Sequence, residues 1–194
     1  MNNEMKNSDL KTKLTFIQAA ERLKSVLRSG KTSLGRKEST AEHTWRLCLF
    51  AMVLEDELKA FDLLKILKIC IIHDLGEALN GDVPAIEKKN KSINKRTEYA
   101  DLMSLLSVLP DKQKEEISSL WLDYEEGRTP EAQIVKALDK LETIVQHNQV
   151  DQGKEFNYEF NLNYGEQYTH AHPCIEILRA FINEDTLQRS NHAK

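Results

Sequence analysis

Apolar side chains recur at intervals of three and four residues along most of the chain, and the alternating pattern of β-strands is hard to find. This pattern predicts an all-α fold of about six or more helices in a single domain. The domain would span residues 1–194, with a core from about 9 to 187 and frayed tails at 1–8 and 188–194. We expect helices at residues 9–28, 39–58, 62–80, 93–109, 111–126, 130–149 and 173–187. Residues 150–172 show no clear period and predict an ordered loop or capping segment.

Short polar signals mark where some of these helices begin and end. Ser39 and Glu42 match a capping box, in which the two side chains satisfy backbone amides of the first helical turn. Gly30 is suited to end the preceding helix. The connection from Arg28 to Lys37 contains four basic residues and no acid. A solvated loop is the simplest interpretation of such a run, and a phosphate-binding role is the competing one.

The most informative stretch is residues 67–77, where an almost unbroken apolar run delivers His73 and Asp74 side by side. In a continuous helix Glu77 would share their face, because residues three and four apart are neighbours on a helix surface. A buried polar pair of this kind is costly unless something satisfies it. A bound metal ion would do so, and a hydrogen-bonded core histidine beside a helix-end acid is the alternative.

Two further predicted helices carry polar side chains on apolar faces. His43 lies in the first turn of the helix at 39–58, whose middle, residues 47–54, is apolar on every side and is expected to be buried. Taken alone, His43 is more simply a core histidine. Asp139 lies at the edge of another apolar face and Glu142 within it, where carboxylates are rarely just solvated. Together with the helix at 62–80, these helices offer two imidazole nitrogens and two carboxylates, from His43, His73, Asp74 and Asp139. Such a mixed set of nitrogen and oxygen ligands suits one divalent ion (Mn, Co, Fe, Ni or Zn).

Composition and charge narrow the class of protein. Of the 194 residues, 40% are hydrophobic and 30% are charged, which is ordinary for a soluble globular protein. No stretch has the apolar length of a membrane span, and residues 1–15 are too polar for a signal peptide. The three cysteines, Cys48, Cys70 and Cys174, are not spaced like the ligands of a metal site. We interpret them as reduced side chains of a cytoplasmic protein. The net charge of −4 gives no general reason to bind nucleic acid, and the basic cluster at 88–96 lacks aromatic neighbours.

The order of the candidate ligands, with helices before, between and after them, resembles the HD-domain metal-dependent phosphohydrolases. The matching motifs are Glu38–His43, His73-Asp74 followed by Glu77, Gly81-Asp82 followed by Pro84, and Lys136 followed by Asp139. They resemble the branch that contains bacterial and eukaryotic 5′-deoxynucleotidases, and the likeness runs from about residue 17 to 182. It implies a phosphoric monoester hydrolase that removes the 5′-phosphate from (deoxy)ribonucleoside 5′-monophosphates by a metal-activated water.

The resemblance also implies a role for each matching residue. The metal ligands would be His43, His73, Asp74 and Asp139, and the catalytic acids Glu77 and Asp82. The candidate substrate-binding residues are Arg28, which matches the family, and its neighbours Ser29 and Lys31. Arg28 would bind the substrate phosphate. Ser29 departs from the best-known bacterial enzyme of this type, in which a Trp crowds the sugar, so weaker exclusion of ribonucleotides is expected. Lys31 or the aromatic segment 156–168 could supply an equivalent wall.

The resemblance bears on metal number and assembly as well. No histidine lies between Asp74 and Asp139, whereas two-metal members of the family resemble one another in having extra histidines there, so we expect a single catalytic metal. The resembling enzymes are dimers, which implies a homodimer. The partner would be a small-molecule nucleotide, with neither a membrane nor a nucleic acid. Two alternatives stay open: a phosphohydrolase of another small phosphate ester, and a non-catalytic HD protein that senses a metal or a nucleotide.

Overall fold

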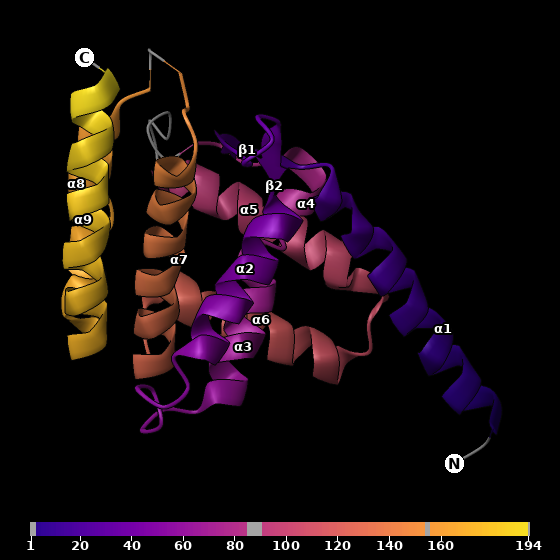
Figure 1. Cartoon of the computed structure of the whole chain (residues 1–194). Coiled ribbons are helices and arrows are strands. Elements are labelled where there is room, and N and C mark those ends of the chain that lie inside the picture. The colour runs from indigo at the N-terminus through magenta and orange to yellow at the C-terminus, as the bar shows by residue number, and fades with distance from the viewer. Residues whose placement is uncertain (1–2, 85–90, 154–155, 194) are drawn as a thin grey trace.

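The computed structural model describes residues 3–84, 91–153 and 156–193. Its α-helices are α1 (Asn3–Ala20), α2 (Thr40–Val53), α3 (Leu63–Ile72), α4 (Glu77–Asn80), α5 (Lys91–Leu105), α6 (Asp111–Glu126), α7 (Pro130–Gln149), α8 (Tyr158–Asn163) and α9 (Pro173–Ala193). Short 3-10 helices are η1 (Glu21–Lys24), η2 (Leu106–Val108) and η3 (Glu166–Ala171), and the strands are β1 (Leu27–Lys31) and β2 (Lys37–Ser39). The predicted all-α class is confirmed, and α7 runs between α2 and the α8–α9 pair (Figure 1).

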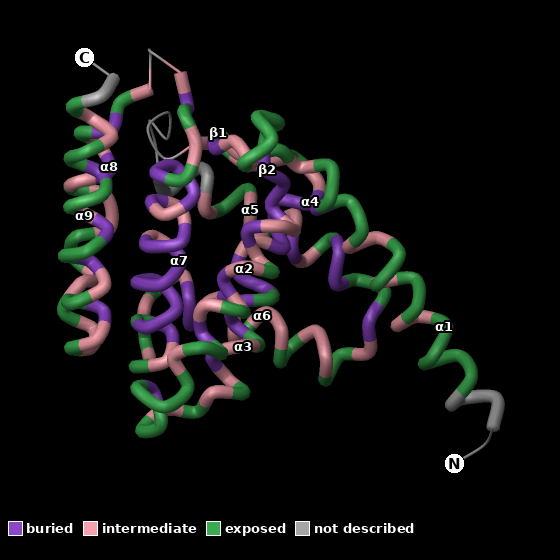
Figure 2. Tube along the Cα trace, viewed as in Figure 1, coloured by how far each residue is buried: buried purple, intermediate pink, exposed green. Residues whose placement is uncertain are grey.

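Two apolar clusters form the core. The first joins α2, α3, α7 and α9 around fully buried side chains such as Ile69 and Leu138. The second joins η1, α5 and α6 around Leu102 and Trp121, and it also takes in Leu75 from the turn after α3. Figure 2 shows how much of α7 is buried. Because the chain passes from one cluster to the other just after α3, the His73-Asp74 pair lies between the two.

The prediction of one continuous helix at 62–80 is wrong. α3 ends at Ile72, the chain turns, and α4 begins at Glu77. A methyl group on Gly76 would overlap the backbone carbonyl oxygen of Glu98 in α5, so the turn passes close against that helix. Packing against α5 therefore sets the break, and Glu77 reaches the site from the start of a new helix.

The segment before α2 departs most from the expected pattern. α1 ends at Ala20 rather than near residue 28, and the chain then forms an antiparallel hairpin of β1 and β2. The prediction of a solvated loop from Arg28 to Lys37 is therefore wrong in part. The capping box is confirmed, because the Ser39 side chain accepts from the Glu42 amide and the Glu42 side chain accepts from the Ser39 amide.

Gly30 shows why the hairpin replaces a helix end. A Cβ on this residue would lie 3.2 Å from Cδ2 of the His147 ring in α7. The small residue therefore serves the close approach of β1 to α7 and does not end a helix. Gln146 of α7 donates to the backbone carbonyl of Lys31, which ties the hairpin to the same helix that carries Asp139.

The exposed apolar side chains of α2 contradict another expectation. Leu47 and Ala51 are buried, but Leu49, Met52 and Val53 are 41%, 54% and 67% exposed. The helix also ends at Val53 rather than at 58. Burial follows only one face of α2, because the opposite face meets no neighbouring element in the described chain.

The first helix lies mostly outside the core. α1 extends away from the body of the molecule toward the N-terminus (Figure 1). Leu10, Leu14 and Ile17, spaced along one side of it, are 56%, 57% and 63% exposed. α1 therefore presents a row of apolar side chains that nothing in the described chain covers.

The later helices follow the sequence closely. α6 and α7 have the predicted bounds, and Thr129 caps α7 by accepting from the Ala132 amide. The expected loop at 150–172 contains α8 and η3, and α9 continues to Ala193.

Part of the basic cluster, residues 88–90, lies outside the described residues. Within the described residues no helix combines the length and the apolar character that crossing a membrane requires.

Candidate active site

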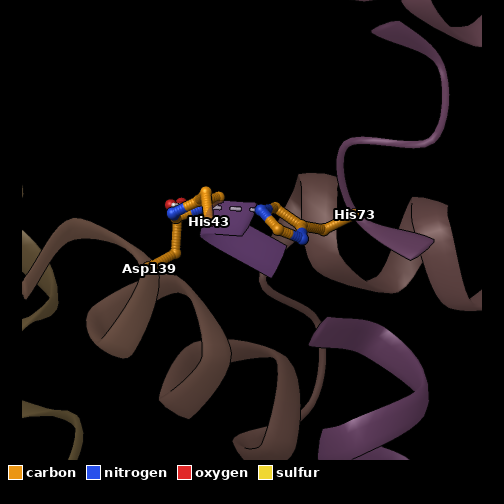
Figure 3. Close-up of side chains that lie close together, drawn as sticks. All are labelled: His43, His73 and Asp139. Carbon is orange, nitrogen blue, oxygen red and sulfur yellow. Dashed lines mark ion pairs between the residues drawn. The ribbon is translucent and has the colours of Figure 1, made fainter. Parts of the chain in front are cut away.

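The predicted metal ligands come together at the centre of the molecule. The His43 Nε2 atom lies 3.2 Å from Asp139 Oδ1, and the His73 Nε2 atom lies 4.0 Å from the same oxygen. Asp74 Oδ2 lies 3.1 Å from His73 Nε2 and 3.8 Å from His43 Nε2. Figure 3 shows the two rings and the Asp139 carboxylate directed toward one another. Such separations suit ligand atoms that share one ion through bonds of about 2.1 Å.

The two imidazoles test whether a cation fits here. Both Nε2 atoms are buried, and neither makes a hydrogen bond in the described part of the chain. Their Nδ1 atoms are engaged, that of His43 with Glu142 and that of His73 with the carbonyl oxygen of Cys70 at 2.8 Å. In the neutral tautomer with Nδ1 as the donor, each Nε2 has a lone pair that it can donate to a cation. Buried acceptors without partners are costly, and a divalent cation would satisfy both.

Asp139 is held in its ionised form. Its Oδ2 atom accepts from the Tyr124 hydroxyl at 2.5 Å and from the Lys140 ammonium at 2.6 Å. Burial opposes the charged carboxylate, but Lys140 and the two nearby histidines outweigh it and hold the pKa of Asp139 well below its ordinary value. One oxygen is thus anchored by the protein, and the other faces His43.

A carboxylate behind His43 fixes that ring. Glu142 binds His43 Nδ1 with one oxygen and accepts from Arg46 Nε at 2.5 Å with the other. Burial and Arg28 lower the pKa of His43, but Glu142 and Asp139 outweigh them and raise it to about 9 in the absence of a cation. A carboxylate on the outer nitrogen of a ligand histidine fixes its tautomer and raises its basicity. Glu38 also approaches His43, but Arg28 and Arg46 accompany these acids, so no second cation is required there.

A cavity of about 280 Å³ opens beside the four ligands. Its wall includes Arg28, Ser29, Glu77 and Asp82, four of the five predicted catalytic and substrate-binding residues. The Arg28 guanidinium donates to Asp74 Oδ2 at 3.2 Å and to the Thr143 hydroxyl at 3.0 Å. Arg28 and the carboxylates therefore give one end of the cavity both a fixed positive group and fixed negative groups.

Glu77 lines the cavity, whereas Lys31 does not. Glu77 is buried, and its Oε2 atom accepts from the Thr40 hydroxyl at 3.2 Å. The Lys31 ammonium donates to the backbone carbonyl of Gln152 at 2.9 Å, and Lys31 is absent from the residues that line this cavity. A contact between Lys31 and substrate stays a prediction.

The sequence interpretation missed three residues that touch the site. Thr143 lies four residues after Asp139, so its helical spacing from a candidate ligand was a usable signal, whereas Lys140 is the next residue along and that spacing does not place it at the site. Tyr124 lies in the apolar core, and its hydroxyl donates to Asp139. Only the tertiary structure places that hydroxyl, because α6 and α7 must first pack together.

Comparisons with known proteins agree with this geometry. A family model described as HD domain matches residues 20–178. A Schizosaccharomyces pombe protein named 5′-deoxynucleotidase is 33% identical over 181 residues, which cover 89% of this chain and 87% of that protein. A human protein named 5′-deoxynucleotidase is 29% identical over 140 residues, covering 71% of this chain and 68% of that protein.

Solved structures share the architecture. A Magnetospirillum magnetotacticum protein described as a predicted metal-dependent phosphohydrolase has a TM-score of 0.81 at 22% identity, covering 94% of this chain and 95% of that one. At this identity the likeness shows the fold alone. A Pyrococcus furiosus protein has a TM-score of 0.61 at 30% identity, covering 86% and 99%. The family match spans the segment from η1 to α9 in which all four candidate ligands lie, and the chain belongs to the HD domain family.

Proposed function

We propose that this chain is a metal-dependent phosphohydrolase that removes the 5′-phosphate from deoxyribonucleoside 5′-monophosphates. One observation carries the proposal: two unpartnered imidazole nitrogens face Asp74 and Asp139 beside a cavity that also contains Arg28. The arrangement offers a cation site and a phosphate site within one cavity. Relatives named 5′-deoxynucleotidase support the substrate class.

Arg28 is the group for the phosphate. Its side chain is 13% exposed, and Asp74 and Thr143 fix its orientation. A planar guanidinium can contact two phosphate oxygens at once. Because the surrounding protein already orders the side chain, little rotamer freedom remains to be lost when the phosphate binds.

The acids supply the proton transfers. Bound at the four ligands, a divalent ion (Mn, Co, Fe, Ni or Zn) would supply Lewis acidity and a water of lowered pKa. Glu77, oriented by Thr40, takes a proton from the attacking water as the water oxygen bonds to phosphorus. The bond from phosphorus to the 5′-oxygen breaks, and the 5′-oxygen gains a proton. Asp82 lines the cavity and would assist that oxygen or hold the sugar. The products are a nucleoside and inorganic phosphate.

A substrate panel tests the proposal. Protein loaded separately with each of the five metals is incubated with dAMP, dTMP, AMP and glycerol phosphate, and released phosphate is measured. We expect the nucleotides to be the best substrates. Metal binding without phosphate release from any nucleotide would favour the non-catalytic sensor, and preference for glycerol phosphate would favour another ester.

Two variants test the assignment of roles. Asp139→Ala should lose turnover and much of the metal affinity, because one of four ligands disappears. Glu77→Ala should lose turnover with metal still bound. Loss of metal from the Glu77 variant, measured by calorimetry, would show that Glu77 is a ligand and that its assignment as a proton acceptor is wrong.

Ser29 bears on the sugar. It lies on the cavity wall next to Arg28, and its small hydroxyl side chain can hydrogen-bond a 2′-hydroxyl instead of excluding it. Exclusion of one hydroxyl by shape is worth roughly 100-fold in known pockets. We therefore expect modest preference for dAMP over AMP, and a larger preference in Ser29→Trp. A strong preference in the unmodified protein that Ser29→Trp leaves unchanged would place selectivity elsewhere.

We also propose a cytoplasmic homodimer. All three cysteines are free thiols, which supports a reducing compartment. The row of exposed apolar side chains on α1, Leu10, Leu14 and Ile17, supports a second copy as the group that covers it, because such rows are usually buried in a partner.

A further inference from the structure

The cavity continues well beyond the phosphate end. α7 contributes Asp139, Thr143 and His147 to its wall, at intervals of four residues along one side of the helix. Eight residues of helix advance about 12 Å. The far end therefore lies at a distance from the metal ligands that a nucleotide can span from its phosphate to its base.

Aromatic rings line the cavity from Tyr164, whose ring centroid lies 5.3 Å from the Lys140 ammonium, past Phe160 to the far end, which we define as His147, Phe156 and Asn161. The rings of Phe160 and Tyr164 are stacked, with centroids 5.4 Å apart and an interplanar angle of 28°. The ring of Phe156 meets that of His147 edge to face at 4.7 Å. Flat apolar faces of this kind stack on heterocyclic bases, and each such contact is typically worth about 1–3 kcal/mol.

Asn161 carries a hydrogen-bond donor that the protein does not use. The residue is 1% exposed. Its Oδ1 atom pairs with His147 Nδ1 at 3.3 Å, and its backbone carbonyl accepts from Arg179 at 3.1 Å. Its Nδ2 atom is buried and has no hydrogen-bond partner among the described residues. A buried amide donor left unpaired costs stability, so its presence in a cavity wall points to a ligand that accepts the hydrogen bond.

We propose that the part of the cavity between Phe160 and His147 is a nucleobase subsite, in which Phe160 and its neighbours stack on the base and Asn161 Nδ2 donates to the base edge. This inference rests on the proposed function, since it names the site for the base of the same nucleotide whose phosphate Arg28 binds.

A single donor suits an acceptor that all four bases share. Purine N3 and pyrimidine O2 are such acceptors, and they occupy equivalent positions on the sugar side of the base. The subsite therefore recognises that a base is present and discriminates little among bases.

The test compares substrates with and without a base. For each variant, kcat/KM is measured on dAMP, dTMP and 2-deoxyribose 5-phosphate, and the ratio of each nucleotide to the sugar phosphate is the readout. We expect the ratio to fall about tenfold in Asn161→Ala and in Phe160→Ala. Asn161→Asp keeps the size and the oxygen that faces His147 but removes the donor, so it should lower the ratio as well.

A control on the same helix separates a local effect from damage to α8. Glu159 is exposed and lies outside the cavity wall, and Glu159→Ala should leave the ratio unchanged. An unchanged ratio in both the Asn161 and the Phe160 variants would overturn the subsite. A fall in kcat/KM that is equal for nucleotides and sugar phosphate would also overturn it, because the residues would then act on the fold or on the phosphate end.

A binding experiment keeps this inference distinct from the proposed activity. Deoxyadenosine and thymidine, which lack the phosphate, are titrated calorimetrically into metal-free protein. We expect both nucleosides to bind and 2-deoxyribose not to bind, with nucleoside binding weakened in Asn161→Ala. Absence of turnover on nucleotides would refute the proposed function alone, whereas absence of nucleoside binding to the unmodified protein would refute the subsite.

Discussion

His147 makes the folded chain sensitive to acid. Burial lowers the pKa of its ring to about 4 from the ordinary value of 6.5, although its hydrogen bond to Asn161 acts in the opposite direction. Below pH 6.5 the unfolded chain takes up a proton at this position, and the folded chain does not do so until about pH 4. The unfolded state then binds more protons, so the free energy of unfolding must fall as the pH falls between these two values.

The size of the effect follows from the two pKa values. Between pH 7 and pH 5 this single residue should cost about 2 kcal/mol of unfolding free energy, and the loss should level off near 3 kcal/mol below pH 4. This is a large part of the stability of a typical domain. Replacement of His147 by Gln removes the titrating group, so the variant should lose less stability than the unmodified protein over the same pH range.

Urea unfolding of metal-free protein at pH 7, 6 and 5 provides the assay, with EDTA present so that metal release does not contribute. His147→Phe serves as a second replacement, because its ring differs in shape from Gln but is equally unable to titrate. Both variants should flatten the pH dependence by the same amount, whatever their stability at pH 7. Parallel curves for the variants and the unmodified protein would refute the reasoning, since His147 would then titrate alike in both states.

Three other changes test separate parts of the structure. Glu142→Gln should weaken metal binding by about 10–100-fold, because the carboxylate that orients and polarises His43 loses its charge; calorimetry with an unchanged dissociation constant would contradict this. Gly76→Ala should destabilise the fold by about 1–3 kcal/mol, since the added methyl group overlaps the Glu98 carbonyl oxygen, and urea unfolding at pH 7 measures the loss. Light scattering should give a mass near twice the 22.3 kDa of one chain, and Leu14→Glu should give the single-chain mass; a monomer at micromolar concentration in the unmodified protein would rule out the dimer.

The sequence was informative wherever a polar residue interrupts an apolar pattern. His43 and Asp139 were recognisable as candidates because each lies on or at the edge of a largely apolar helix face, and a buried charge or imidazole needs a partner. Helix bounds were predictable where caps were strong. Thr129 and Pro130 placed the start of α7 correctly for this reason.

What could not be predicted depends on contacts between distant segments. The residues of β1 carry no alternation, and the strand forms by pairing with β2 and passes close to His147 at Gly30. The break after Ile72 has no proline, and its glycine, Gly76, lies where the turn packs against α5. The free amide of Asn161 is likewise a property of the folded cavity, since nothing in the local sequence distinguishes it from other asparagines.

The origin of the candidate metal ligands in distant parts of the chain has a kinetic consequence. His43 and Asp139 are far apart in sequence, and they meet only after α2, α3 and α7 have packed together. A cation that requires all four ligands can therefore bind only a nearly complete fold, and it stabilises that fold selectively. Interactions absent from the folding transition state change the unfolding rate and leave the folding rate almost unaffected. Metal should accordingly lengthen the lifetime of the folded chain by a factor of one plus the ratio of the free metal concentration to Kd, while refolding proceeds equally fast in EDTA.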